Sequence, residues 1–194
     1  MKPRAAKKPP AGAPSPVPTR SAEAARRGGE GASKRDPGPS MGSDVPRDIV
    51  YLHPGQVFAS SEPSAVTTIL GSCVAVVLWD DARRVGGLNH YLLPLWARPG
   101  DDTLRFGNVA FERLLAELTA RGAVRSRLRA KVFGGACLLV GAARGDHLGT
   151  KNVDVAHSLL ATARIPLIAE DVGGRRGRKL IVHTDTGDAW VKLL

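Results

Sequence analysis

The stretch Leu70–Pro94, LGSCVAVVLWDDARRVGGLNHYLLP, holds two apolar runs separated by a short polar segment. The first run, SCVAVVLWD, is continuous, rich in valine and of strand length, which predicts a strand buried on both faces. DDARR predicts a turn, and VGGLNHYLLP predicts a return strand that stops at Pro94. The stretch therefore predicts a hairpin, in which Gly86-Gly87 either leaves space for a substrate chain or marks a bulge.

Cys73 and His90 stand near the open end of this predicted hairpin. A two-residue turn at Asp81 and Ala82 would place them directly opposite each other, with Cβ atoms about 4.5–5.5 Å apart. A four-residue turn from Asp81 to Arg84 would make them diagonal neighbours, and in either register both side chains share one face. An imidazole beside a thiol helps it to ionise, so the pair is a candidate nucleophilic site. A buried structural cysteine and histidine is the alternative interpretation.

The rest of the chain from residue 46 alternates between predicted strands and helices. NVAFERLLAELTARG and KNVDVAHSLLATARI have apolar residues at helical spacing, with Asn108 and Asn152 as expected N-caps. Further predicted strands are DIVYLHPGQVFAS, broken at Pro54-Gly55, then RLRAKVFGGACLLV, PLIAEDVGG, KLIVHTD and DAWVKLL. The last two form a predicted hairpin around Thr186-Gly187. The sequence therefore predicts a mixed α/β domain in which strands outnumber helices.

The chain has 194 residues and a net charge of +10, and half of this excess lies in residues 1–45. That segment holds nine Lys or Arg, four Asp or Glu and eight of the fourteen prolines, with little to bury. We therefore expect a disordered tail at 1–45 and one domain at 46–194. A polyanion-binding arm is the alternative for the tail, but a basic composition alone is a weak signal of nucleic-acid binding.

The cysteine and histidine content indicates which cellular compartment and which kinds of site to expect. Two cysteines form no disulfide framework, and neither a secretory signal nor an apolar run of about 18 residues is present, so we expect a cytoplasmic protein without membrane insertion. Cys137 is expected to be a small core residue. His147 and His157 lack the partner spacing of a metal site, so no metal ion is expected.

Several segments together resemble the CheD family, the chemoreceptor glutamine deamidases of bacterial and archaeal chemotaxis. In order, they are TTILGSCVAVVLWD, GGLNHYLLP, AKVFGGA, LGTKNV and EDVGGRRGRKLIVHTDTGDAWVKL. The resemblance covers nearly all of the expected domain. It implies a central β-sandwich of mixed sheets with flanking helices, and a Cys-His hydrolase core similar to that of the toxins that deamidate Rho GTPases.

The resemblance also implies roles for individual residues. Cys73 would be the nucleophile, His90 its base, and Thr67 the residue that orients His90. Backbone N–H groups around Gly71 and Ser72 would stabilise the oxyanion. A receptor glutamine would form a thioester with loss of ammonia, and water would release glutamate, with no metal or organic cofactor required.

The implied partners are the cytoplasmic coiled-coil region of chemoreceptors and, in some organisms, a CheC-type phosphatase. We expect a monomer that does not bind nucleic acid. Three other functions stay open on the sequence alone. They are a non-catalytic adaptor of the same fold, a receptor methylesterase that uses the same acyl-enzyme chemistry, and a cysteine protease.

Overall fold

The structure is a computed structural model that describes residues 15–16, 46–95, 103–138 and 147–194. Its helices are α1 (Gly107–Ala120) and α2 (Leu148–Ala163), with a short 3-10 turn, η2 (Arg125–Arg127). The strands are β1 (Ser15–Pro16), β2 (Asp48–Tyr51), β3 (Gln56–Ser60), β4 (Ser64–Leu70), β5 (Val74–Asp80), β6 (Val85–His90), β7 (Arg129–Gly134), β8 (Leu167–Val172), β9 (Arg178–His183) and β10 (Ala189–Leu193).

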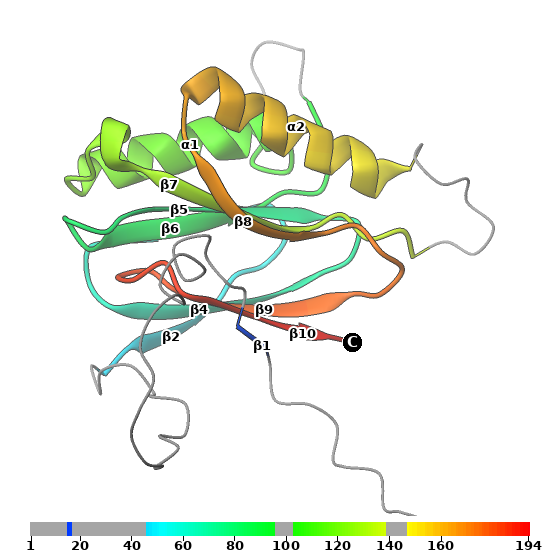
Figure 1. Ribbon diagram of the computed structural model, residues 1–194, viewed down its shortest axis with the longest axis horizontal. Helices are drawn as coiled ribbons and strands as arrows, with labels where there is room; N and C mark the ends of the chain where they lie inside the picture. The colour runs from blue at the N-terminus through cyan, green and yellow to red at the C-terminus, as the bar shows by residue number, and fades with distance from the viewer. Residues whose placement is uncertain (1–14, 17–45, 96–102, 139–146) are drawn as a thin grey trace, which may run out of the picture.

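The elements form three stacked layers, which are two sheets and a pair of helices (Figure 1). One sheet has the order β1-β10-β9-β4-β2, and the other has the order β3-β6-β5-β7-β8. Both sheets are mixed, because β2 runs parallel to β4 and β7 runs parallel to β8, whereas the remaining pairs are antiparallel. The prediction of a mixed domain built around a β-sandwich is confirmed.

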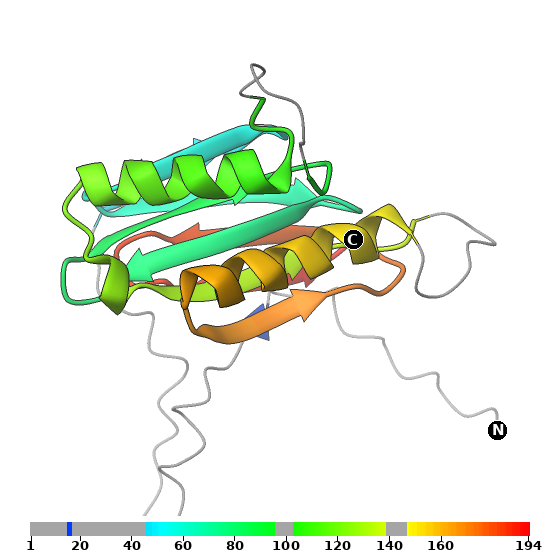
Figure 2. The same ribbon diagram turned by 90° about the horizontal axis from the view of Figure 1, so that it is seen from above.

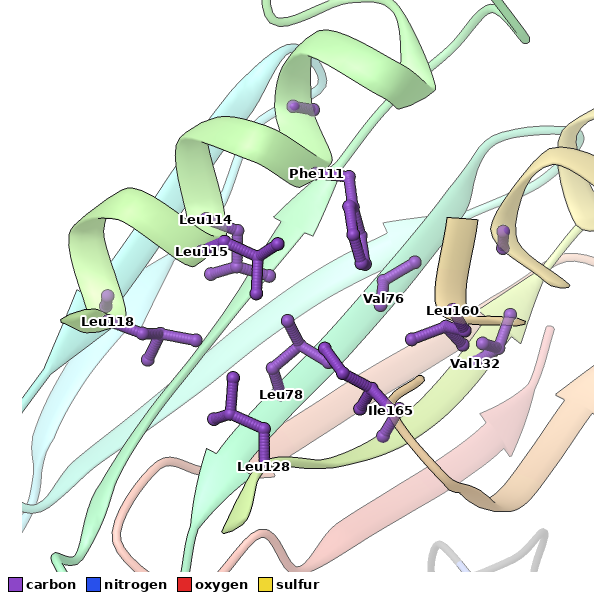
Figure 3. Packing of buried hydrophobic residues seen from close by; sticks show 14 of the residues in the cluster. Val76, Leu78, Phe111, Leu114, Leu115, Leu118, Leu128, Val132, Leu160 and Ile165 are labelled. Atoms are coloured by element: carbon purple, nitrogen blue, oxygen red, sulfur yellow. The ribbon is translucent and has the colours of Figure 1, made fainter. Parts of the chain in front are cut away.

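β5 is the central strand of the fold, and every one of its residues is buried. Val76 and Leu78 point toward the helices (Figure 3), whereas Ala75 and Val77 pack in the cluster between the two sheets. Alternate side chains of a strand point to opposite faces, so a strand with a core on each side needs apolar residues at every position. The continuous apolar run in the sequence was therefore read correctly as a strand buried on both faces.

Both helices cover the same sheet, and each crosses a different pair of strands (Figure 2). α1 packs on β3 and β6, and α2 packs on β5 and β7. Phe111, Leu114 and Leu118 form the buried stripe of α1, at the spacing that the sequence predicted. The helices therefore flank one side of the sandwich only.

The expected N-caps are wrong for both helices. α1 begins at Gly107 after Phe106 in the N-cap position, with no side-chain cap, so Asn108 lies inside the helix. α2 has His147 at its N-cap, where the ring accepts a hydrogen bond from the Thr150 N–H at 3.2 Å. Asn152 thus lies within α2, fully buried, and its side chain is free for another role.

One strand of the site is missing from the sequence prediction. β4 was not predicted, because four of the seven residues of SAVTTIL are serine, threonine or alanine. β2 and β3 were predicted correctly as one segment broken at Pro54-Gly55, but the break transfers the chain from one sheet to the other.

The tail predicted at residues 1–45 lies outside the described residues except for β1, which pairs with β10. No helix in the described part of the chain is long and apolar enough to span a membrane.

Gly86 and Gly87 neither leave room for a substrate nor mark a bulge. They pair regularly, with Gly86 opposite Trp79 and Gly87 opposite Leu78. A Cβ on Gly86 would stand 2.1 Å from the carbonyl oxygen of Thr184, in the turn that follows β9, and a Cβ on Gly87 would stand 2.3 Å from a backbone oxygen of β3. These glycines let neighbouring backbones approach closely.

The contact at Gly86 predicts a large loss of stability for Gly86→Ala. The new methyl group would meet a backbone oxygen that cannot rotate away, so we expect the free energy of unfolding to fall by about 3 kcal/mol. Gly177→Ala is the matched control, because a Cβ there meets nothing closer than 3.4 Å. Urea unfolding of both variants measures the difference, and equal midpoints would contradict the predicted clash.

Candidate active site

Cys73 lies where the chain passes from one sheet to the other, between the end of β4 and the start of β5. It is half-buried and carries a free thiol. The carbonyl groups of the connecting segment are all held. Gly71 accepts from the Ala136 N–H at 2.8 Å, and Cys73 accepts from the Gly135 N–H at 2.8 Å. The Ser72 carbonyl accepts from a side-chain amide of α2 at 2.9 Å. The backbone around the thiol is therefore fixed on three consecutive residues.

His90 is the last residue of β6, and the hairpin register sets its distance along the strand from Cys73. β5 and β6 pair with the four-residue turn, as the pairs Asp80–Val85 and Val77–Leu88 show. The ladder continues to an isolated bridge between Val74 and Tyr91. Because Cys73 precedes one bridge partner and His90 precedes the other, the two residues are diagonal neighbours. Of the two registers left open by the sequence, the four-residue turn is confirmed.

Cys73 and His90 also share the face that points between the two sheets. Cys73 packs against the inter-sheet cluster that includes Ala75. His90 reaches across to the other sheet, where its Nδ1 lies 2.8 Å from the hydroxyl oxygen of Thr68 on β4. The pairing of β5 with β6 and the stacking of the sheets thus bring a thiol, an imidazole and a hydroxyl to one end of the sandwich.

The hydroxyl of Thr68 determines which nitrogen of His90 carries the proton. Thr68 Oγ1 also lies 2.8 Å from the carbonyl oxygen of Leu52, to which it donates its only hydrogen. A carbonyl can only accept, so Thr68 Oγ1 must accept from an Nδ1–H of His90. The neutral ring then has an unprotonated Nε2. This atom is buried and has no partner among the described residues, so it is the nitrogen able to accept the proton of a thiol.

Thr67, the residue that the family resemblance assigned to this role, points elsewhere. Its hydroxyl donates to the carbonyl oxygen of Leu180 on β9 at 3.2 Å. Adjacent residues of a strand point to opposite faces, and the inward positions of β4 are Val66, Thr68 and Leu70. The expected contact of Thr67 with His90 is corrected to Thr68. Apolar residues two positions before and after Thr68 were the signal in the sequence, but they are informative only once β4 is recognised as a strand.

Burial sets the charge state of both groups. Desolvation is the main cause that lowers the pKa of His90, to about 4. A hydrogen bond with the Leu52 backbone opposes this shift, and the electrostatic interaction with His53 adds to it. Desolvation raises the pKa of the Cys73 thiol, opposed by its own backbone N–H. Both groups are therefore neutral near pH 7. At rest, the two diagonal neighbours are a neutral thiol and a neutral imidazole, not a thiolate and an imidazolium.

The other residues that the sequence analysis considered for a site make their own contacts, apart from the hydrogen bond of His90 with Thr68. The backbone N–H groups of Gly71 and Ser72 make no hydrogen bond to another backbone group within the described chain. Cys137 donates its backbone N–H to Gly174. His157 lies 2.8 Å from a carboxylate oxygen of Glu170 on the surface. In the parts of the chain that are described, no three His, Cys, Asp or Glu side chains gather as metal ligands would.

Sequence reasoning missed a second residue, Asn152, which had been read as a helix cap. Its side-chain amide is the donor to the Ser72 carbonyl, at 2.9 Å, and also donates to the Leu92 carbonyl at 2.9 Å. No local pattern in LGTKNV indicates this contact, because it joins residues far apart in the chain.

Comparison with known proteins gives the family of the chain. The model of the family described as CheD chemotactic sensory transduction matches residues 92–193. A probable chemoreceptor glutamine deamidase of Anaeromyxobacter dehalogenans is 53% identical over 149 residues, which cover 76% of this chain and 86% of the relative. Proteins with the same description in Trichlorobacter lovleyi and Sulfurimonas denitrificans are 46% identical over 137 residues and 41% identical over 143 residues, covering 71% and 73% of this chain and 85% and 92% of the relatives. On this similarity, the chain belongs to the CheD family.

Proposed function

We propose that this protein is a chemoreceptor glutamine deamidase that hydrolyses the side-chain amide of receptor glutamines to glutamate. The observation that carries the proposal is the chain of hydrogen bonds from Leu52 through Thr68 to His90 Nδ1, which leaves Nε2 unprotonated on the face shared with Cys73. The names of the relatives supply the substrate class. A non-catalytic adaptor would need neither this tautomer nor the thiol beside it.

In the proposed acylation step, His90 Nε2 removes the proton of the Cys73 thiol as sulfur attacks the side-chain carbon of glutamine. The carbonyl oxygen becomes an oxyanion, which the free N–H groups of Gly71 and Ser72 stabilise. The His90 imidazolium then gives its proton to the amide nitrogen, the C–N bond breaks and ammonia leaves. Carbon remains bonded to sulfur as a thioester.

In the proposed deacylation step, water loses a proton to His90 Nε2 and attacks the thioester carbon. The C–S bond breaks and the sulfur recovers the proton from His90. The carboxylic acid so formed loses its proton to solvent, which leaves glutamate with one added negative charge. Throughout both steps Thr68 Oγ1 accepts from Nδ1–H, so it stabilises the imidazolium and prevents the ring from rotating. Thr68 thus takes the orienting role of a third residue, as in other Cys-His hydrolases.

The cellular setting follows from the same proposal. The substrate is the cytoplasmic region of a chemoreceptor, so the proposed enzyme acts in the cytoplasm. We propose that it is a monomer and that a CheC-type phosphatase is a candidate regulator. New negative charges on a receptor helix would change how the helices pack. The chemistry proposed here needs only the side chains and backbone of this chain.

Mass spectrometry of a receptor fragment tests the reaction. Replacement of an amide nitrogen by oxygen adds about one dalton per glutamine, and thioester chemistry requires the thiol. We expect the wild type and Cys137→Ser to cause this gain at the same glutamines, and Cys73→Ser to cause none. Cys137 is the other free thiol of the chain, so an equal gain with all three proteins would exclude Cys73 as the nucleophile.

Paired threonine variants test which hydroxyl orients the base. Thr68→Val keeps the shape of the side chain but removes the acceptor for His90 Nδ1, and we expect kcat to fall about 100-fold. Thr67→Val removes a hydroxyl with the same chemistry that bonds Leu180 instead, so its kcat should stay at the wild-type value. The opposite ranking of the two variants would restore Thr67 to the orienting role.

The pH dependence of kcat/KM tests the charge state of the free enzyme. His90 must be unprotonated to act as a base, so the acid side of the profile should follow its pKa of about 4 rather than the ordinary 6.5. We expect kcat/KM to be nearly constant between about pH 5 and 7, where most of an ordinary histidine would become protonated. A tenfold decline across that interval, with circular dichroism unchanged, would contradict a buried neutral imidazole.

A further inference from the structure

Asn152 is fully buried and contacts the backbone on both sides of the hairpin that carries Cys73 and His90. Its Nδ2 donates to the carbonyl oxygens of Ser72 and Leu92, each at 2.9 Å. Ser72 directly precedes Cys73, and Leu92 follows His90 by two residues. One amide group on α2 therefore ties together the two chain segments that hold the thiol and the imidazole.

These two contacts occur where the regular hydrogen bonding of the hairpin ends. The last pairing between the two segments is the bridge of Val74 with Tyr91, and Ser72 and Leu92 lie beyond it. The hydroxyl of Tyr91 donates to the backbone carbonyl of Asn152, which adds a third bond between α2 and this end of the hairpin. The Asn152 amide thus links the two segments beyond the bridge to each other through the helix.

The first turn of α2 is packed on the segment that follows β7. A Cβ on Gly149 would stand 2.3 Å from the Gly135 carbonyl oxygen, so the helix and that segment are in direct backbone contact. The Gly135 N–H in turn donates to the Cys73 carbonyl at 2.8 Å. Asn152 therefore lies on a helix that is packed directly against neighbouring backbone, and not on a mobile loop.

An asparagine at this position also has a cost that packing alone does not explain. Its Oδ1 is buried and has no hydrogen-bond partner among the described residues. A buried acceptor without a partner lowers stability, whereas an apolar side chain of the same size would avoid that cost. Residues that reduce stability in this way are characteristic of functional sites, where geometry has a use beyond folding.

We propose that Asn152 is a positioning residue of the active site, whose amide holds the backbone at Ser72 and Leu92 and so fixes the chain segments that carry the Cys73 thiol and the His90 imidazole relative to each other. The inference rests on the proposed function for its effect on deamidation. It does not depend on that function for its effect on the thiol, because the rate of thiol alkylation by a small reagent is measured in the absence of any receptor.

Two variants of Asn152 and one control test this role in a Cys137→Ser background, where Cys73 is the single thiol. Asn152→Asp keeps the shape but replaces both donated hydrogens by an acceptor, and Asn152→Leu keeps apolar packing without a buried carboxylate. Asp80→Asn is the matched control at the closed end of the same hairpin. There the buried carboxylate accepts from the backbone N–H groups of Arg83 and Val124.

The first measurement is the rate of Cys73 alkylation by iodoacetamide at pH 7, with thermal unfolding of each variant. Misplacement by a fraction of an ångström weakens base assistance, so we expect both Asn152 variants to react about tenfold more slowly, and we expect the same of His90→Ala. Asp80→Asn should lose comparable thermal stability and keep the wild-type alkylation rate. Equal alkylation rates in all folded variants would reduce Asn152 to a structural residue and overturn the proposal.

The second measurement is deamidation of the receptor fragment by the same proteins. We expect the Asn152 variants to lower kcat about tenfold with KM unchanged, because the amide acts on the reacting groups and not on receptor binding. A rise in KM with kcat preserved would overturn the positioning role. If the wild type does not deamidate the fragment, the proposed function fails, and the alkylation rates still decide the role of Asn152.

Discussion

β5 lies between two hydrophobic cores, and its burial constrains the residues around it. Val76 and Leu78 belong to the helix-facing core, and Ala75 and Val77 belong to the core between the sheets. A shift of one residue in its pairing would exchange these two sets, so the register with β6 is strongly specified. That register fixes His90 relative to Cys73. The geometry of the site is therefore a consequence of how the hydrophobic cores are filled.

The site holds two of the four buried side-chain polar atoms that have no hydrogen-bond partner among the described residues. His90 Nε2 and Asn152 Oδ1 are both buried without partners in the described part of the chain, although most buried polar atoms in proteins are paired. The first is the atom that must accept a proton in the proposed reaction, and the second belongs to the amide that links Ser72 to Leu92. Burial also keeps the thiol and imidazole neutral, so the proposed reaction begins with proton transfer and not from a preformed ion pair.

Sequence patterns predicted features that lie within a single helix, strand or hairpin. They did not predict features that depend on contact between two elements distant in the sequence. The strand at β5, the stripe of α1 and the terminal hairpin follow from periodicity and turn residues. The caps at Asn108 and Asn152 were wrong, because a helix can begin earlier when backbone packing, as at Gly149, supports its first turn. The interpretation of Gly86 failed for a similar reason, since the oxygen of Thr184 that it accommodates lies in the turn after β9, far away in the sequence.

The sequence by itself determined the mixed domain, the hairpin of Leu70–Pro94 and the placement of Cys73 and His90 on one face, because strand alternation is a local property of the chain. Only the tertiary structure decided between the two turn registers, replaced Thr67 by Thr68 and assigned Asn152 to the carbonyls of Ser72 and Leu92. Each of these depends on contacts between segments distant in sequence, which stacking of the sheets and docking of α2 create. A hydrogen bond between two segments that are distant in the sequence produces no periodic pattern in the sequence of either one.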